Sequence, residues 1–317
     1  MTCAKVGLLI GLLCTLMTFG QTTKDNSPSS KEKPNPALRV DIDLVLVTAA
    51  VTDSSHRYIS GLTPEHFQVF EDKIKQDVQY FSQEDVPLSV GIIFDSSGSM
   101  ENKMMAARAA AATFLRMGNR EDEYFLIEFN DSPQVLQDFT SDVTRLQNRL
   151  LATRARGSTA LYDALYLGME KVSRGSNPRK ALLLITDGED NHSRYSFRDV
   201  REFAKEHDVL IYGMGIIDEA SAQYSDHSGK GVLEDLAKLT GGVAFFPDSL
   251  GELESICMQI GLDLKNQYVL GYHSQNHAND GKWRKIQVKM NPPKGSPRLS
   301  VRTKTGYYAP SIATAMK

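Results

Sequence analysis

Residues 88–99 have the sequence LSVGIIFDSSGS, in which an almost wholly apolar run ends in an aspartate and a serine-rich loop. A run of this kind is typical of a strand that is buried between two layers of helices. An alanine-rich stretch with helical character, 102–117, follows the loop. We therefore expect a strand, a polar loop and a helix, which together would open a parallel sheet.

The same alternation of strand and helix patterns continues from residue 87 to residue 262. A turn at 130–133 leads into a short run at 135–139, and this hairpin predicts one antiparallel strand at the edge of the sheet. The predicted fold class is thus α/β, a doubly wound and mostly parallel sheet with an antiparallel edge strand. The expected strands are 88–94, 123–129, 135–139, 181–186, 209–215 and 243–246, and the expected helices are 102–117, 142–152, 160–173, 196–206, 232–239 and 249–265.

Both flanks of this region have patterns of half-exposed strands. Apolar and charged residues alternate at the start of the segment 38–86, and the pattern returns in the segment 263–310. We expect the two segments to pack together as a small flanking β module beside the α/β domain of 87–262, with a tail at 311–317. The strands expected in the module are one that starts at 38, then 58–62, 67–71, 78–81, 268–272, 283–290 and 299–303.

The first twenty residues have the pattern of a secretory signal peptide. Lys5 supplies a positive charge, 6–17 is apolar, and Thr18 and Gly20 are small residues at the −3 and −1 positions of a cleavage site. An uncleaved membrane anchor is disfavoured, because the apolar stretch is shorter than the roughly 20 residues that span a bilayer. We therefore expect cleavage after residue 20 and a secreted or periplasmic protein.

The composition of the rest of the chain excludes several classes of protein. Residues 21–37 are polar and rich in Ser, Lys, Asn and Pro, which predicts a disordered linker, and no later stretch predicts a transmembrane segment. Cleavage leaves one cysteine, Cys257, which excludes an internal disulfide and a cysteine-based zinc site. The formal net charge of the whole chain is −3, without a broad basic field, so binding to nucleic acid is not expected.

Three polar motifs lie at the ends of expected strands or helices. The motif DSSGS (95–99) follows the strand 88–94, GST (157–159) precedes a helix, and TDGED (186–190) follows another apolar strand. The carboxyl ends of the strands form the ligand-binding edge of an open α/β sheet. Loops at that edge can bring the three motifs together.

The side chains of these motifs are hard oxygen ligands. Asp95 and Asp187 supply carboxylates, and Ser97, Ser99 and Thr159 supply hydroxyls. Such a set, without His or Cys, favours Mg²⁺ or Mn²⁺ over zinc or copper. Because the protein supplies few ligands, a coordination position would stay open, and a carboxylate from a protein partner would suit it best.

The three motifs in this order resemble the metal-ion-dependent adhesion site of von Willebrand factor type A domains, and the resemblance covers about residues 87–262. It implies a doubly wound sheet with one antiparallel edge strand. It also implies that Asp95, Ser97, Ser99 and Thr159 are direct or water-linked metal ligands and that Asp187 acts through water. More narrowly, the flanking segments resemble von Willebrand A-related proteins of acidobacteria, a resemblance that implies no established activity.

The predicted function is binding of a protein partner through a divalent cation, and we do not expect an enzyme. Ser97 and Ser99 do not lie in a Gly-x-Ser-x-Gly motif, and no histidine is evidently placed as their base. Two alternatives stay open. The protein could be a structural component of the cell envelope that the metal only stiffens or, less favoured, a metal-assisted hydrolase.

Overall fold

The computed structural model describes residues 44–188, 190–217, 229–293, 295 and 298–311. The predicted signal peptide, the predicted linker and nearly all of the predicted tail lie outside these residues, as does the start of the N-terminal β segment. Every helix within the described part of the chain is too short or too polar to span a bilayer.

A six-stranded sheet forms the centre of the α/β part, with the strand order β10-β9-β8-β5-β6-β7. Its first five strands are parallel, and β7 pairs antiparallel with β6 at the edge, which confirms the predicted fold class. Every residue of β5 is buried, as its apolar sequence requires. The strands are β5 (Leu88–Asp95), β6 (Glu123–Phe129), β7 (Pro133–Thr140), β8 (Arg179–Thr186), β9 (Leu210–Gly215) and β10 (Ala244–Phe245).

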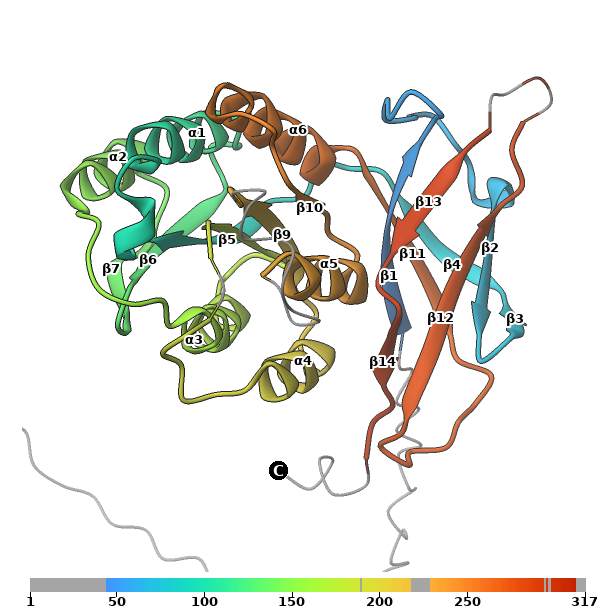
Figure 1. Ribbon diagram of the computed structural model, residues 1–317. Helices are drawn as coiled ribbons and strands as arrows, with labels where there is room; N and C mark the ends of the chain where they lie inside the picture. The colour runs from blue at the N-terminus through green and yellow to red at the C-terminus, as the bar shows by residue number, and fades with distance from the viewer. Residues whose placement is uncertain (1–43, 189, 218–228, 294, 296–297, 312–317) are drawn as a thin grey trace, which may run out of the picture. The chain divides into compact units, whose positions relative to one another are not determined.

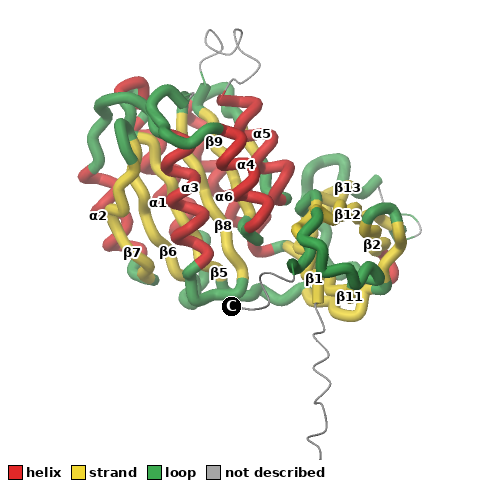
Figure 2. Tube along the Cα trace, turned by 90° about the horizontal axis from the view of Figure 1, so that it is seen from below, coloured by secondary structure: helices red, strands yellow, loops and turns green. Residues whose placement is uncertain are grey.

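Helices cover both faces of this sheet (Figure 1). Ile92 and Leu126 pack on the face covered by α1, α2 and α6, whereas Ile93 and Phe125 pack on the face covered by α3, α4 and α5. Successive side chains of a strand point to opposite faces, so a strand covered on both sides is apolar at every position. Figure 2 views the sheet from one of its faces, with the strands running alongside the helices. The helices are α1 (Met104–Arg116), α2 (Val143–Ala152), α3 (Leu161–Ser173), α4 (Phe197–Glu206), α5 (Gly229–Thr240) and α6 (Leu253–Lys265).

The segments before and after the α/β part form a β module of two four-stranded sheets, ordered β13-β1-β11-β4 and β14-β12-β2-β3. β1 pairs antiparallel with β11, and β2 pairs antiparallel with β12, so the flanking β module is confirmed. Val47, Val69 and Tyr268 are fully buried in its core. The strands are β1 (Leu44–Thr52), β2 (Phe67–Glu71), β3 (Ile74–Gln76), β4 (Val78–Ser82), β11 (Gln267–His273), β12 (Trp283–Met290), β13 (Ser300–Thr303) and β14 (Gly306–Tyr308).

The strand expected at 58–62 is wrong. Tyr58 forms an isolated bridge, and the rest of the segment is a loop. The hydroxyl of Tyr268 donates a hydrogen bond to the carbonyl of Ile59 at 2.7 Å and accepts one from the N–H of Leu62 at 3.2 Å. Because a side chain satisfies these backbone groups, the segment buries Leu62 without a strand ladder.

Other differences occur where elements are short. β3 and β14 each span three residues, too few for an alternating pattern to indicate a strand. The last helix begins at Leu253 instead of 249, because Leu250–Glu252 form a 3-10 turn, η3. Two further 3-10 turns are η1 (Pro64–His66) and η2 (Gly98–Met100).

An ion pair between a half-buried arginine and a buried aspartate connects the α/β part to the β module. Asp263 of α6, whose side chain is 1% exposed, pairs with Arg302 of β13 and accepts a hydrogen bond from the Tyr212 hydroxyl at 2.7 Å. Arg302 Nε also donates to the carbonyl of Gly241, just after α5, at 2.9 Å. Burial raises the pKa of Asp263, whereas the charge of Arg302 opposes this shift. The arginine thus ties two helices to one strand of the module.

We predict that Arg302→Met lowers the free energy of unfolding by about 3 kcal/mol, because it leaves the carboxylate of Asp263 buried without its counter-ion. Urea denaturation followed by circular dichroism measures the change. Arg298→Met, at an exposed position just before β13, is the control and should change stability by less than about 0.5 kcal/mol. Equal losses in the two variants would contradict the structural role of the pair.

Candidate metal-binding site

The first predicted motif lies at the carboxyl end of β5, between the neighbouring strands β8 and β6. Asp95 is the last residue of β5 and is fully buried, and Ser97 is 1% exposed. The short turn η2 then carries Ser99 to the surface before α1 begins. A strand end in the middle of the sheet therefore places the motif at the edge where the other two loops also arrive.

Backbone hydrogen bonds join the loop after β5 to the loop before α3. The N–H of Gly98 donates to the carbonyl of Gly157 at 3.0 Å, and the N–H of Arg156 donates to the carbonyl of Ser96 at 2.8 Å. Gly157 has a φ of 72°, and a Cβ there would lie 2.5 Å from a carboxylate oxygen of Asp131. Only glycine suits both the left-handed backbone and this close approach.

Asp95 is held by two hydrogen bonds. Its Oδ1 accepts from the N–H of Ser97 at 2.8 Å, and its Oδ2 accepts from the hydroxyl of Thr186, at the end of β8, at 2.5 Å. Burial raises the pKa of Asp95 to about 6, although both hydrogen bonds favour the ionised form. The negative charge of Asp187 raises this pKa further. Two carboxylates are thus held close to each other at the end of the sheet.

Asp187 joins the third loop to the first. Its Oδ1 accepts a hydrogen bond from the hydroxyl of Ser99 at 2.8 Å, and the Nζ of Lys103 lies 2.7 Å from its Oδ2. The hydroxyls of Ser97 and Ser99 are 3.2 Å apart. Asp95, Ser97, Ser99 and Asp187 consequently form one hydrogen-bonded chain across two loops.

Thr159 lies beside this chain of contacts and is 4% exposed. Its N–H donates to the side chain of Asn191 at 2.8 Å, and its carbonyl accepts from the N–H of Asn191 at 3.0 Å, so it is fixed against the loop after β8. A Cβ on Gly188 would lie 3.9 Å from the Thr159 hydroxyl oxygen. The structure thus brings all five predicted residues to the same edge of the sheet.

Two residues that complete the site were not among the predicted ligands. Thr186 orients Asp95, and Lys103 pairs with Asp187. The sequence placed Thr186 in the third motif but gave no sign of its contact with a strand 91 positions earlier. From the sequence alone, Lys103 resembles an ordinary solvated lysine at the start of a helix. Its role is visible only in the structure, where the third loop lies beside it.

The donor set is compatible with a hard divalent cation. It offers two carboxylates and three hydroxyls, all oxygen ligands of the kind that Mg²⁺ and Mn²⁺ prefer. Within the described residues, no group of three or more His, Cys, Asp or Glu side chains could hold a metal ion by itself. Metal binding at this edge would therefore depend on the hydroxyls of the serines and the threonine.

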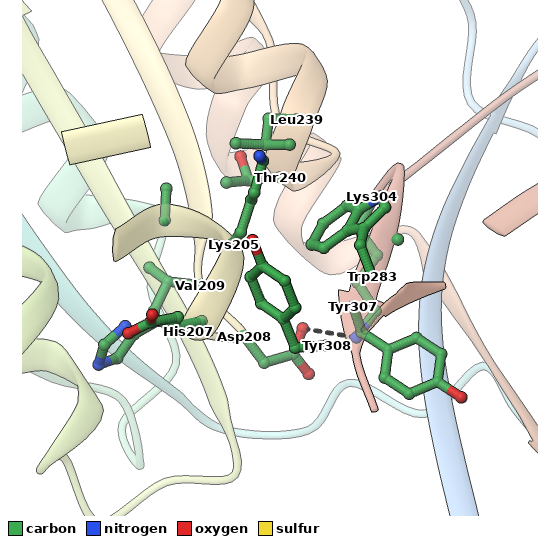
Figure 3. Close-up of a pocket in the computed structure, with 13 residues that line it drawn as sticks. Lys205, His207, Asp208, Val209, Leu239, Thr240, Trp283, Lys304, Tyr307 and Tyr308 are labelled. Atoms are coloured by element: carbon green, nitrogen blue, oxygen red, sulfur yellow. Dashed lines mark hydrogen bonds and ion pairs between the residues drawn. The ribbon is translucent and has the colours of Figure 1, made fainter. Parts of the chain in front are cut away.

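A separate pocket lies between α4, α5 and the strands β12 and β14, away from the five residues (Figure 3). Lys304 and Asp208 on its wall form an ion pair of 2.9 Å, and Trp283 meets Tyr308 edge to face with ring centroids 5.1 Å apart. Lys205 lies over the Trp283 ring at 5.5 Å. Several residues of its walls thus pair with one another where the α/β part meets the β module.

Comparison with known proteins places this architecture in a family. Residues 90–189 match the family model of the von Willebrand factor type A domain, so this part of the chain is assigned to that domain family. The match begins within β5, includes the first two loops of the candidate site and extends into the third. The resemblance drawn from the sequence motifs is thereby confirmed, whereas the narrower acidobacterial grouping stays a prediction.

Similar proteins are distant in sequence. An uncharacterized protein of Synechocystis sp. is 22% identical over 162 residues, which cover 50% of this chain and 37% of that protein. A von Willebrand factor type A structure from Catenulispora acidiphila is 11% identical, with coverage of 87% and 75% and a TM-score of 0.49. Proximal thread matrix protein 1 from the mussel byssus, solved with a zinc-occupied MIDAS motif, is 16% identical, with coverage of 61% and 49% and a TM-score of 0.49.

The raised pKa of Asp95 predicts an unusual pH dependence of stability without divalent cations. The folded carboxyl holds its proton up to about pH 6, whereas the unfolded one loses it near 3.8. Stability should therefore fall as the pH rises from about 4 to about 6, by about 1.4 kcal/mol per unit of pKa difference. Asp95→Asn has no carboxyl group at this position and should not show this loss. Urea denaturation in EDTA should therefore show that the free energy of unfolding of the variant rises relative to that of the wild type between about pH 4 and about pH 6. Parallel stability curves would contradict the buried, high-pKa carboxyl.

Proposed function

We propose that this protein binds a protein partner through a divalent cation held by Asp95, Ser97, Ser99, Thr159 and Asp187. The observation that supports the proposal is the convergence of three loops, which brings these five oxygen-bearing side chains to one edge of the sheet. Von Willebrand factor type A domains are in general interaction modules, not enzymes. The proposed activity is therefore adhesion or recognition.

The cation that suits the site best is Mg²⁺ or Mn²⁺. Hydroxyl and carboxylate oxygens are hard ligands, and a small octahedral cation keeps several waters when the protein supplies few charges. A carboxylate of the partner would replace one of those waters. Ser99 is the exposed member of the five and marks the side from which a partner would approach.

The contacts of the serines argue against hydrolysis. A serine nucleophile needs a base within hydrogen-bond reach. In the described part of the chain, Ser97 and Ser99 hydrogen-bond to each other and to Asp187, and neither contacts a histidine ring. These hydroxyls are placed as ligands or as parts of the loop network, not as activated nucleophiles.

We further propose that the protein acts outside the cytoplasm, either secreted or in the periplasm. The support is the signal peptide pattern of residues 1–20, which lie outside the described structure. The buried Cys257 is a free thiol, so the described part of the chain contains no disulfide. Its stability comes instead from the two packed hydrophobic layers of the α/β part and the core of the β module.

Calorimetric titration tests the cation site directly. We expect Mg²⁺ to bind the wild type with one-to-one stoichiometry and to give no binding heat with Asp95→Ala, because that change removes a carboxylate at the centre of the site. Asp138→Ala, which removes an exposed carboxylate on β7, is the matched control and should bind Mg²⁺ as the wild type does. Equal binding by Asp95→Ala and the control would refute the assignment.

Partner binding should depend on the same cation. The immobilised protein should capture a protein from an envelope extract in the presence of Mg²⁺, lose it in EDTA and regain it when Mg²⁺ is restored. Asp95→Ala should capture nothing under any of these conditions. Capture that persists in EDTA, from a protein that does bind Mg²⁺, would instead support the structural alternative in which the metal only stiffens this edge.

A further inference from the structure

Lys103 is an unexpected member of the candidate cation site. Its Nζ lies 2.7 Å from Oδ2 of Asp187, and the two side chains are only 13% and 1% exposed. Most other ion pairs of the described chain have at least one strongly exposed partner, such as Lys171 with Asp138. The ammonium group of Lys103 is therefore largely shielded from solvent. It lies beside Asp187, which is one of the proposed cation ligands.

The position of Lys103 is set by rigid backbone. Its N–H donates to the carbonyl of Met100 at 2.8 Å, and its own carbonyl accepts from the N–H of Ala107 at 3.0 Å, in the first turn of α1. Ser99, four residues earlier, donates to the other oxygen of the same carboxylate. One short segment thus brings the hydroxyl of Ser99 to one carboxylate oxygen of Asp187 and the ammonium group of Lys103 to the other.

We propose that Lys103 is an internal counter-ion that competes with the divalent cation for Asp187 and so sets a weak, readily reversible affinity for that cation. This inference rests on the proposed function, because it concerns the same site. The competing charge makes partner binding responsive to the concentration of the cation, since the site does not stay saturated when the cation is scarce.

Electrostatics gives the direction of the effect. Asp95 and Asp187 together offer two negative charges, and the ammonium group reduces their sum to one, which weakens the attraction for a divalent cation. It also repels the incoming ion, in an enclosed place where charges are less screened than at an exposed surface. Without the cation, the same pair neutralises one of two neighbouring carboxylates and so stabilises the empty loops.

The test compares neutral substitutions of Lys103 with a matched control. Lys103→Met removes the charge, and Lys103→Gln removes it while keeping a side chain that can hydrogen-bond to Asp187, which protects the fold. Lys171→Met is the control, because Lys171 forms an ion pair of the same 2.7 Å length with Asp138, and its side chain is 17% exposed. Affinity for Mg²⁺ is measured by calorimetry, and the thermal midpoint is measured in EDTA and in excess Mg²⁺.

Both Lys103 variants should bind Mg²⁺ about tenfold more tightly than the wild type, a modest share of the attraction available to charges at this distance. They should melt at a lower temperature in EDTA, and Mg²⁺ should raise their midpoint more than that of the wild type. Lys171→Met should leave both the affinity and the Mg²⁺-dependent shift unchanged.

Each other outcome is decisive. Unchanged or weaker affinity in both Lys103 variants, with a wild type that binds Mg²⁺, overturns the role of Lys103 and leaves the proposed function standing. Binding by the variants but not by the wild type supports the competing charge and overturns the proposed function. Absence of binding in every protein overturns both.

Discussion

The arrangement of the site depends on the burial of Asp95 at the end of the central strand. A carboxylate without solvent must find hydrogen-bond donors, and it finds them in the backbone of Ser97 and in the hydroxyl of Thr186 on the neighbouring strand. Those two contacts define the path of the first loop and its distance from the third. The remaining contacts, from Ser99 to Asp187 and from Gly98 to Gly157, follow from that starting geometry.

The β module gives the domain a different kind of constraint. Its sheets pair strands that precede the α/β part in the sequence with strands that follow it. Arg302 of the module also contacts Asp263 of α6 and the carbonyl of Gly241 at the end of α5. Since α6 leads directly into β11, the last helix is anchored at its end by a strand and by an ion pair. The edge that carries the five candidate ligands lies at the other end of the parallel strands, where ligand-binding loops of α/β sheets are found.

The two carboxylates of the candidate site place negative charge where it lowers the stability of the metal-free protein. Asp95 is buried with a raised pKa, and Asp187 shares the same small region, which a protein selected for stability alone would avoid. Lys103 offsets part of this cost within the chain. A site of this kind holds mutually repelling carboxylates on a rigid scaffold. Such an arrangement is expected where a bound cation neutralises the carboxylates.

The sequence by itself determined the elements and their order. Strands with strong patterns, 67–71 and 123–129, appear with the predicted bounds, and the three motifs contain the five residues that the structure brings to one edge of the sheet. It failed where long-range contacts override local patterns, because Tyr268 holds 58–62 as a loop. Only the tertiary structure decided that Thr186 orients Asp95 and that Lys103 neutralises Asp187, since these partners are 91 and 84 positions apart in the chain. Local periodicity reports on burial, whereas the pairing of charges depends on which strand ends the folded sheet brings together.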